Sequence, residues 1–152
     1  MWSSVVKVFD ESMSAFVPKT TPTANLPHLS KIDRKPKPIG IEFKCVADGL
    51  TGMMLHLEIA RGEKEMGGAR YVDTCKKAST ACCLRLMDGT VRDKNCVVPS
   101  MDKKPMPRQT FLGDSWFSSV ETAEAMAVRG HDCIGVVKTA SNQFPQKIWL
   151  TR

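Results

Sequence analysis

Two aspartates follow segments whose composition predicts β-strands, and their side chains are the first candidates for chemistry in this sequence. Asp10 comes directly after the β-branched run of residues 4–9, and Asp114 follows a short apolar segment that leads into a predicted helix. In open α/β sheets, ligands meet side chains at the carboxyl ends of strands. Two carboxylates at neighbouring strand ends repel each other unless a cation lies between them. Mg²⁺ ions about 3.5–4 Å apart, bridged by such carboxylates, can activate a water or a 3′-hydroxyl for phosphodiester chemistry.

Each aspartate also has a purely structural interpretation. Asp10 and Glu11 could open a solvated turn, which is the simpler reading of an isolated strand end. An aspartate just before a helix is usually its N-cap. Ser118 and Glu121, however, have the S-x-x-E spacing of a capping box, which predicts that Ser118 caps this helix. Asp114 is then left without a capping role, which favours a functional carboxylate.

The segment around Asp114 predicts a β-α-β unit. The helix is expected over residues 120–129, where good helix formers dominate, and Gly130 can end it with a left-handed cap. Residues 133–137 (CIGVV) are short, apolar and β-branched, as in a buried strand.

The first half of the chain predicts an antiparallel hairpin. Residues 39–47 have the period of a half-buried strand, in which apolar side chains alternate with Glu42, Lys44 and Val46. Residues 48–52 (DGLTG) have turn chemistry and lead to a return strand over residues 53–60. We expect Asp48 to serve this turn.

The order of predicted elements indicates the fold class. A glycine-rich loop over residues 62–73 leads to a helix over residues 76–87, which Gly89 is expected to stop. Three strands, a helix, a strand, a helix and a strand therefore follow one another. We predict an α/β (α+β) fold whose mixed sheet is a three-strand meander followed by a β-α-β unit, the layout of a partial ribonuclease H-like core.

Composition narrows the class of protein. The chain has 152 residues, a formal net charge of +6 and a pI near 9.1, which suit one domain and make polyanions plausible partners. Its six cysteines include no C-x-x-C pair, so reduced thiols are expected rather than a zinc site or a disulfide framework. The sequence shows neither an apolar leader nor a run of 18 apolar residues. We therefore expect an intracellular protein without a membrane span.

Two predicted loops contain several basic side chains each. A proline-rich basic loop spans about residues 17–38, and a polar loop spans about residues 88–108. Either loop could lie along a phosphate backbone or simply stay solvated. The side chains that we predict as nucleic-acid contacts are Lys35, Lys37, Lys103, Lys104 and Arg108.

Four sequence blocks resemble the piggyBac transposases and the proteins derived from them. They are VFDESMSAF at residues 8–16, KPKPIGIEFKCVADGLTG at 35–52, GDSWFSSVETAEAMAVRG at 113–130 and IGVVKTASNQFP at 134–145. Their order and separation are also similar to those of the family. The resemblance covers most of the chain.

The resemblance implies a DDE/DDD ribonuclease H-like core that cuts and joins DNA with a divalent metal. Asp10 in the DESM block then corresponds to the first catalytic aspartate and Asp114 in the GDSWF block to the second, and both would be ligands of Mg²⁺ or Mn²⁺. Trp116 and Phe117 would pack beneath the site. DNA is the implied partner and the nucleus the implied location.

This sequence departs from the family pattern at the third catalytic aspartate. The acids after Asp114 are Glu121, Glu124 and Asp132, and none matches the third position. We therefore interpret residues 1–152 as the first part of a transposase core that is inactive alone. Exposed faces of the incomplete sheet could then support self-association.

Two other interpretations remain open at this stage. The chain could be a domesticated or relic protein that binds DNA or another partner without catalysis. It could also be part of a longer, active transposase.

Overall fold

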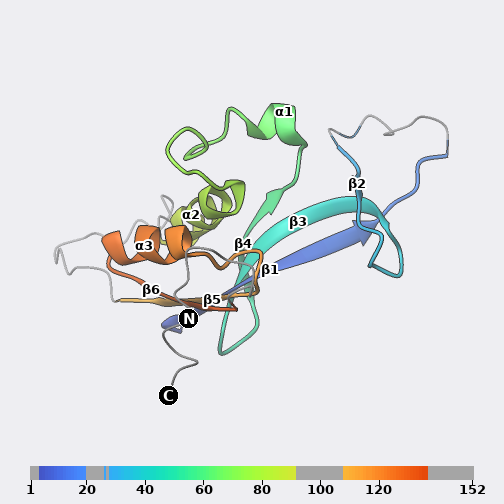
Figure 1. Cartoon of the computed structure of the whole chain (residues 1–152). Helices are drawn as coiled ribbons and strands as arrows, with labels where there is room; N and C mark the ends of the chain where they lie inside the picture. The colour runs from blue at the N-terminus through green and yellow to red at the C-terminus, as the bar shows by residue number, and fades with distance from the viewer. Residues whose placement is uncertain (1–3, 20–25, 27, 92–107, 137–152) are drawn as a thin grey trace, which may run out of the picture.

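The computed structural model describes residues 4–19, 26, 28–91 and 108–136. Within these residues the chain forms a mixed sheet and helices on one side of it (Figure 1). The elements in chain order are β1 (Val6–Ala15), β2 (Ser30–Lys31), β3 (Ile39–Asp48), β4 (Met54–Ile59), α1 (Glu63–Met66), α2 (Ala78–Val91), β5 (Thr110–Gly113), α3 (Val120–Val128) and β6 (Asp132–Gly135).

The sheet has the predicted layout of a meander followed by a β-α-β unit. β1 pairs with β3 and β3 with β4, both antiparallel, and the two-residue strand β2 pairs with the start of β3. On its other edge β1 pairs in parallel with β5, and β5 pairs in parallel with β6. This mixed α+β arrangement confirms the predicted fold class.

The core lies between the sheet and the two longer helices, α2 and α3. Phe9, Val46 and Phe111 of the sheet are buried against side chains of α2 and α3, including Cys83 and Met126. Among the described elements, no helix covers the opposite face of the sheet (Figure 1). Apolar side chains are exposed there on the outer strands, namely Leu57, Ile59 and Ile134.

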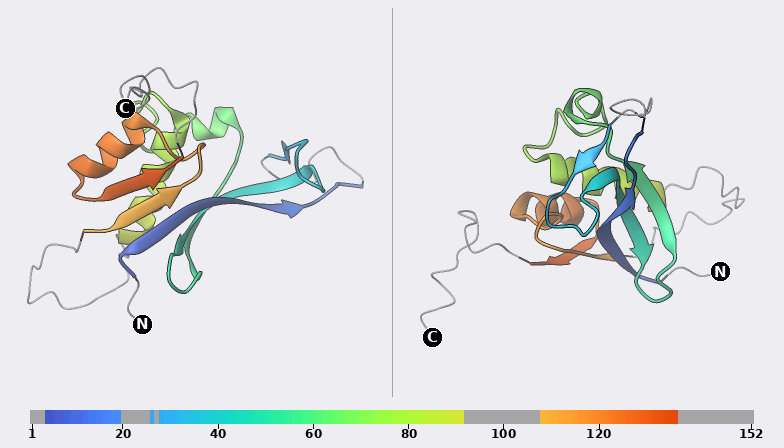
Figure 2. Two further views of the ribbon diagram at one scale, coloured as in Figure 1. Left: turned by 60° about the horizontal axis from the view of Figure 1, so that its bottom comes forward. Right: turned by 90° about the vertical axis from the view of Figure 1, so that its right-hand side faces the viewer.

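β1 and β3 form an arm that extends beyond the helices (Figure 2). Their pairing continues from Lys7 opposite Asp48 to Ala15 opposite Gly40. A Cβ atom at Gly40 would lie 2.1 Å from the Ser14 carbonyl oxygen, so the end of the arm requires glycine there.

The first strand is longer than predicted. It was expected over residues 4–9, but it continues through Asp10 to Ala15 because β3 offers a hydrogen-bonding partner along this whole length. Asp10 therefore does not open a turn. It lies within β1, at the point where pairing with the shorter β5 has ended.

The helix predicted over residues 76–87 also extends further, through Gly89 to Val91. Gly89 does not stop the helix but allows β4 to approach it, because a Cβ atom there would lie 2.3 Å from Cδ2 of His56. The sequence suggested a helix stop at a position where the fold requires a small side chain.

Three smaller expectations were wrong. The strand predicted as buried over residues 133–137 is β6, with Ile134 58% exposed, because the described chain places no element over its outer face. The predicted loops over residues 17–38 and 62–73 each contain a short element, β2 in the first and α1 in the second.

In the described part of the chain, no helix is long and apolar enough to span a membrane.

The turn between β3 and β4 is organised by Asp48, as predicted. Its Oδ1 accepts hydrogen bonds from the amides of Leu50 and Thr51, at 3.1 and 3.0 Å. Its Oδ2 lies 3.3 Å from the ammonium of Lys7, whose side chain is 2% exposed. Asp48 thus joins a turn to the start of β1 and has a structural role.

Candidate active site

Asp10 lies within β1, and Asp114 directly follows β5, the parallel neighbour of β1. The pairing of β1 with β5 sets Val8 opposite Leu112. Asp10 and Asp114 are each two residues beyond this last pair of the ladder. The sheet therefore brings together the two segments that carry the predicted metal ligands.

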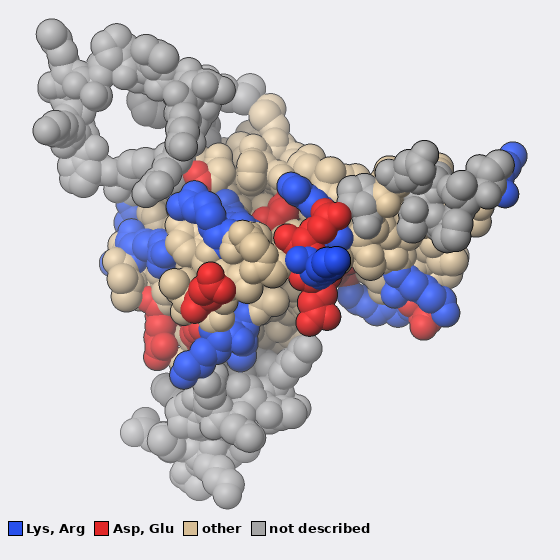
Figure 3. Space-filling model, turned by 90° about the horizontal axis from the view of Figure 1, so that it is seen from above, with Lys and Arg blue, Asp and Glu red and all other residues tan. Residues whose placement is uncertain are grey.

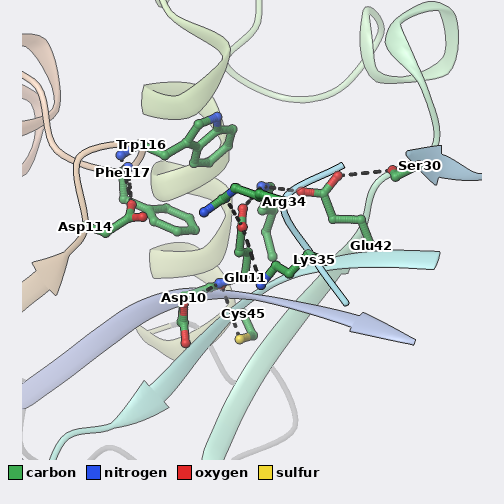
Figure 4. Close-up of polar contacts among 11 residues, drawn as sticks. Asp10, Glu11, Ser30, Arg34, Lys35, Glu42, Cys45, Asp114, Trp116 and Phe117 are labelled. Carbon is green, nitrogen blue, oxygen red and sulfur yellow. Dashed lines mark hydrogen bonds and ion pairs between the residues drawn. The ribbon is translucent and has the colours of Figure 1, made fainter. Parts of the chain in front are cut away.

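The Asp114 carboxylate organises the turn that follows β5. Its Oδ1 accepts hydrogen bonds from the amides of Trp116 (2.8 Å) and Phe117 (3.4 Å) (Figure 4). Its carbonyl oxygen accepts one from the amide of Ser118 at 3.0 Å. Asp114 therefore has a structural task that the sequence did not indicate. Its Oδ2 has no hydrogen bond to any described residue, so one oxygen stays available to a ligand.

The predicted capping box does not form. Ser119, not Ser118, is the N-cap of α3 and accepts a hydrogen bond from the Thr122 amide at 3.1 Å. Ser118 Oγ instead donates to the Gly113 carbonyl oxygen at 3.0 Å. Glu121 accepts from the amides of two residues before α2, Lys76 and Lys77, and thereby ties the two helices together.

A stack of aromatic rings joins β1, β5 and the turn that follows β5. The ring of Phe9 lies 5.1 Å from that of Phe111 and 5.7 Å from that of Phe117. Phe117 is buried, as expected for packing beneath the site, whereas Trp116 is 36% exposed. The stack places the turn after Asp114 directly on the strand that carries Asp10.

Glu11 is the centre of an ion-pair cluster that was not predicted from the sequence. One carboxylate oxygen contacts Arg34 and lies 3.8 Å from the Lys35 ammonium, and the other lies 3.1 Å from the Lys44 ammonium (Figure 4). The Lys44 ammonium also lies 2.6 Å from Glu42 Oε1. The regular spacing of Glu42 and Lys44 along β3 was a signal for this cluster.

The Lys44 side chain lies on the helix side of the sheet and is largely buried. Burial alone would lower the pKa of its ammonium, but the hydrogen bonds and charges of Glu42 and Glu11 outweigh this, and the pKa stands above its usual value. Lys44 is therefore a permanent cation on the helix side of the sheet, opposite Glu11 in the β1–β3 pair.

Cys45 lies opposite Asp10 in the β1–β3 pair, and its Sγ donates to the Asp10 carbonyl oxygen at 3.3 Å. Burial raises the pKa of this thiol, and the negative charge of Asp10 raises it further. The group stays protonated near neutral pH and does not act as a thiolate ligand. Its protonated state agrees with the reduced thiols expected from the sequence; all cysteines in the described part of the chain are free.

The residues predicted to contact nucleic acid differ in their surroundings. Lys37 is exposed, Lys35 is paired with Glu11, and Arg108 forms an exposed bidentate pair with Asp132. The remaining two, Lys103 and Lys104, lie outside the described residues. Seen from the helix side, basic and acidic side chains are intermixed and form no continuous basic patch on the visible described surface (Figure 3).

The donor atoms at the site suit a hard divalent cation, but they do not complete a site. Asp10 is exposed, and its Oδ1 accepts a hydrogen bond from the Glu11 amide at 2.7 Å. Asp10 and Asp114 offer carboxylate oxygens, which Mg²⁺ and Mn²⁺ prefer. No group of three or more potential metal ligands occurs among the residues that the structure describes. The two aspartates thus fit part of a metal site.

The sheet order, with β1 between the antiparallel β3 and the parallel β5, is the mixed α+β arrangement predicted from the sequence. The sequence profile of the family described as Transposase IS4 matches residues 4–152, and the chain belongs to this family. No curated protein sequence matches the chain.

A solved structure with a similar fold is that of a piggyBac transposase, determined by cryo-electron microscopy in a synaptic complex with hairpin DNA. The two share 17% sequence identity with a TM-score of 0.69, and the match covers 99% of this chain and 27% of the other. The chain thus spans about a quarter of the length of this transposase, and the similarity shows a common fold.

Proposed function

We propose that this chain carries the first part of the catalytic core of a piggyBac-type DDE/DDD transposase. The observation that carries the proposal is the parallel pairing of β1, which contains Asp10, with β5, which ends one residue before Asp114. The family assignment and the fold shared with the piggyBac transposase support it. DNA is the proposed substrate, which would place the protein in the nucleus.

Asp10 and Asp114 would hold Mg²⁺ or Mn²⁺ through their free carboxylate oxygens. Bound there, the metal would supply a Lewis acid that activates a water or a 3′-hydroxyl and stabilises charge on the phosphate. The amides of Trp116 and Phe117 hold Oδ1 of Asp114, which fixes the plane of that carboxylate. Lys35 and Lys37 would attract the DNA backbone toward this end of the sheet.

The chain alone is expected to be inactive in strand cleavage and joining. The acids that follow Asp114 have other surroundings. Glu121 binds the amides before α2, Asp132 pairs with Arg108, and Glu124 is exposed on α3. None of them supplies a third carboxylate, and an incomplete set of ligands holds a metal weakly.

A second function is supported by the role of Asp114 in its turn. Because its carboxylate organises the backbone after β5, Asp114 has a structural reason to be present without any metal. The protein would then be a relic or domesticated chain that binds DNA or another partner without catalysis. Metal binding distinguishes the two functions.

Thermal unfolding in millimolar Mg²⁺ or Mn²⁺ tests the proposal. A ligand that binds only the native state stabilises it, by about 1.4 kcal/mol at nine times its dissociation constant, so the wild-type midpoint should rise. Asp10→Asn and Asp114→Asn should each remove this rise. Asp73→Asn, which changes an exposed acid in the loop before α2, is the matched control and should keep it. A wild-type midpoint that does not respond to either metal would support the relic function instead.

A further inference from the structure

Lys44 contacts both β1, the strand that carries Asp10, and the turn that follows Asp114. We propose that it is a positioning residue, which fixes the Asp114 turn against β1 and thereby sets the geometry of the Asp10 and Asp114 carboxylates. This role rests on the proposed function, since it concerns how well the two aspartates hold a metal. Lys44 is not expected to touch metal or DNA itself.

On one side, the Lys44 ammonium is bound to the strand of Asp10. It lies 3.1 Å from Oε2 of Glu11, the residue that directly follows Asp10. The other oxygen of Glu11 contacts Arg34 and Lys35, so the carboxylate is held from two directions (Figure 4). A charge-assisted hydrogen bond to a carboxylate held in this way limits the movement of β1 at Asp10.

On the other side, the same ammonium lies over the turn that Asp114 organises. It is 3.9 Å from the centre of the Trp116 ring and 5.8 Å from that of Phe117. The Trp116 amide donates to Asp114 Oδ1 at 2.8 Å. A cation over the face of an indole attracts the ring and is most effective when water is excluded, as it is for Lys44 at 8% exposure.

The charges around Lys44 explain why loss of its ammonium would change the geometry of the candidate metal ligands. Glu11 and Glu42 both contact this ammonium. Without the cation, two neighbouring carboxylates would face each other and the indole would lose its partner. Removal of a group that orients a metal ligand without touching the metal commonly weakens metal binding by about 10–100-fold.

Mn²⁺ binding to the purified chain, measured by electron paramagnetic resonance of the free ion, tests the role of Lys44. Lys44→Met keeps the length of the side chain and removes its charge, and it should raise the Mn²⁺ dissociation constant about tenfold or more. Lys44→Arg keeps the charge and should restore most of the affinity. Lys7→Met is the matched control, because it removes another buried lysine of the same strand pair but at the other end of β1.

Trp116→Leu provides a second variant should Lys44→Met fail to fold, since Trp116 is partly exposed and its loss disturbs the core less. It should also weaken Mn²⁺ binding, whereas Trp116→Phe should weaken it less. A folded Lys44→Met or Trp116→Leu that binds Mn²⁺ like the wild type would overturn the positioning role and leave the proposed function intact. A wild type that binds no Mn²⁺, or whose binding is unchanged in Asp10→Asn, would overturn both.

Discussion

Replacement of Gly89 by alanine tests the close packing of β4 against α2. In a helix interior, Gly→Ala is ordinarily stabilising by about 0.5–1 kcal/mol, because glycine loses more backbone entropy on folding. Here the new Cβ atom would lie 2.3 Å from Cδ2 and 2.5 Å from Cγ of His56. We therefore expect the opposite sign for this substitution.

The size of the effect follows from how His56 is held. Because Cγ itself is too close, rotation of the ring about its own bond does not relieve the clash, and the whole side chain or β4 must move. β4 is restrained by its pairing with β3 and by the bidentate contact between Arg85 and Glu58. Overpacking of this kind costs about 1–3 kcal/mol. After the gain in helix propensity is subtracted, Gly89→Ala should lower the free energy of unfolding by about 1 kcal/mol.

Urea unfolding of a double-mutant cycle provides the measurement. In a His56→Ala background the clash is absent, and Gly89→Ala should raise the free energy of unfolding by about 0.5–1 kcal/mol. His56 is exposed, so its own replacement should cost little. If Gly89→Ala stabilises the protein equally in both backgrounds, the predicted contact between His56 and α2 is wrong.

Two further predictions concern Asp114 and His131. Asp114→Ala removes the acceptor of two turn amides and should cost about 0.5–2 kcal/mol in urea unfolding. Asp114→Asn keeps an Oδ1 acceptor and should cost clearly less, so equal losses would contradict the turn role. Burial lowers the pKa of His131, the positive charge of Arg129 lowers it further, and the Asp132 carboxylate partly opposes them. Just below the unfolded-state pKa of 6.5, the unfolded chain then binds more protons than the native one, so stability should fall as pH decreases through this value. Between about pH 8 and about pH 5.5, the urea midpoint should fall more in the wild type than in His131→Gln. Equal falls in the two proteins would refute the role of His131 in this pH dependence.

The sequence by itself determined the type and order of the main elements and the two candidate acids. Local signals were sufficient for these features. The β-branched run before Asp10, the turn chemistry after Asp48 and the helix formers after Ser119 each act over a few neighbouring residues. The GDSWF block also marked the right turn, although it did not show that Asp114 binds the amides of that turn.

Features that depend on distant partners could not be predicted in this way. Lys44 meets Glu11 across 33 residues of sequence, and Glu121 meets the Lys76 amide across 45. Gly89 was predicted to stop a helix because the residues next to it in sequence give no sign of its close approach to His56.

The tertiary structure decided how the site is assembled. Parallel pairing joins β1 to β5, two strands far apart in sequence, and this pairing brings together the segments that carry Asp10 and Asp114. The physical reason is that local propensity fixes an element's type, whereas its neighbours are chosen by burial and by hydrogen bonding between segments far apart in sequence. The sequence therefore indicated the two acids, and the sheet brought together the segments that carry them.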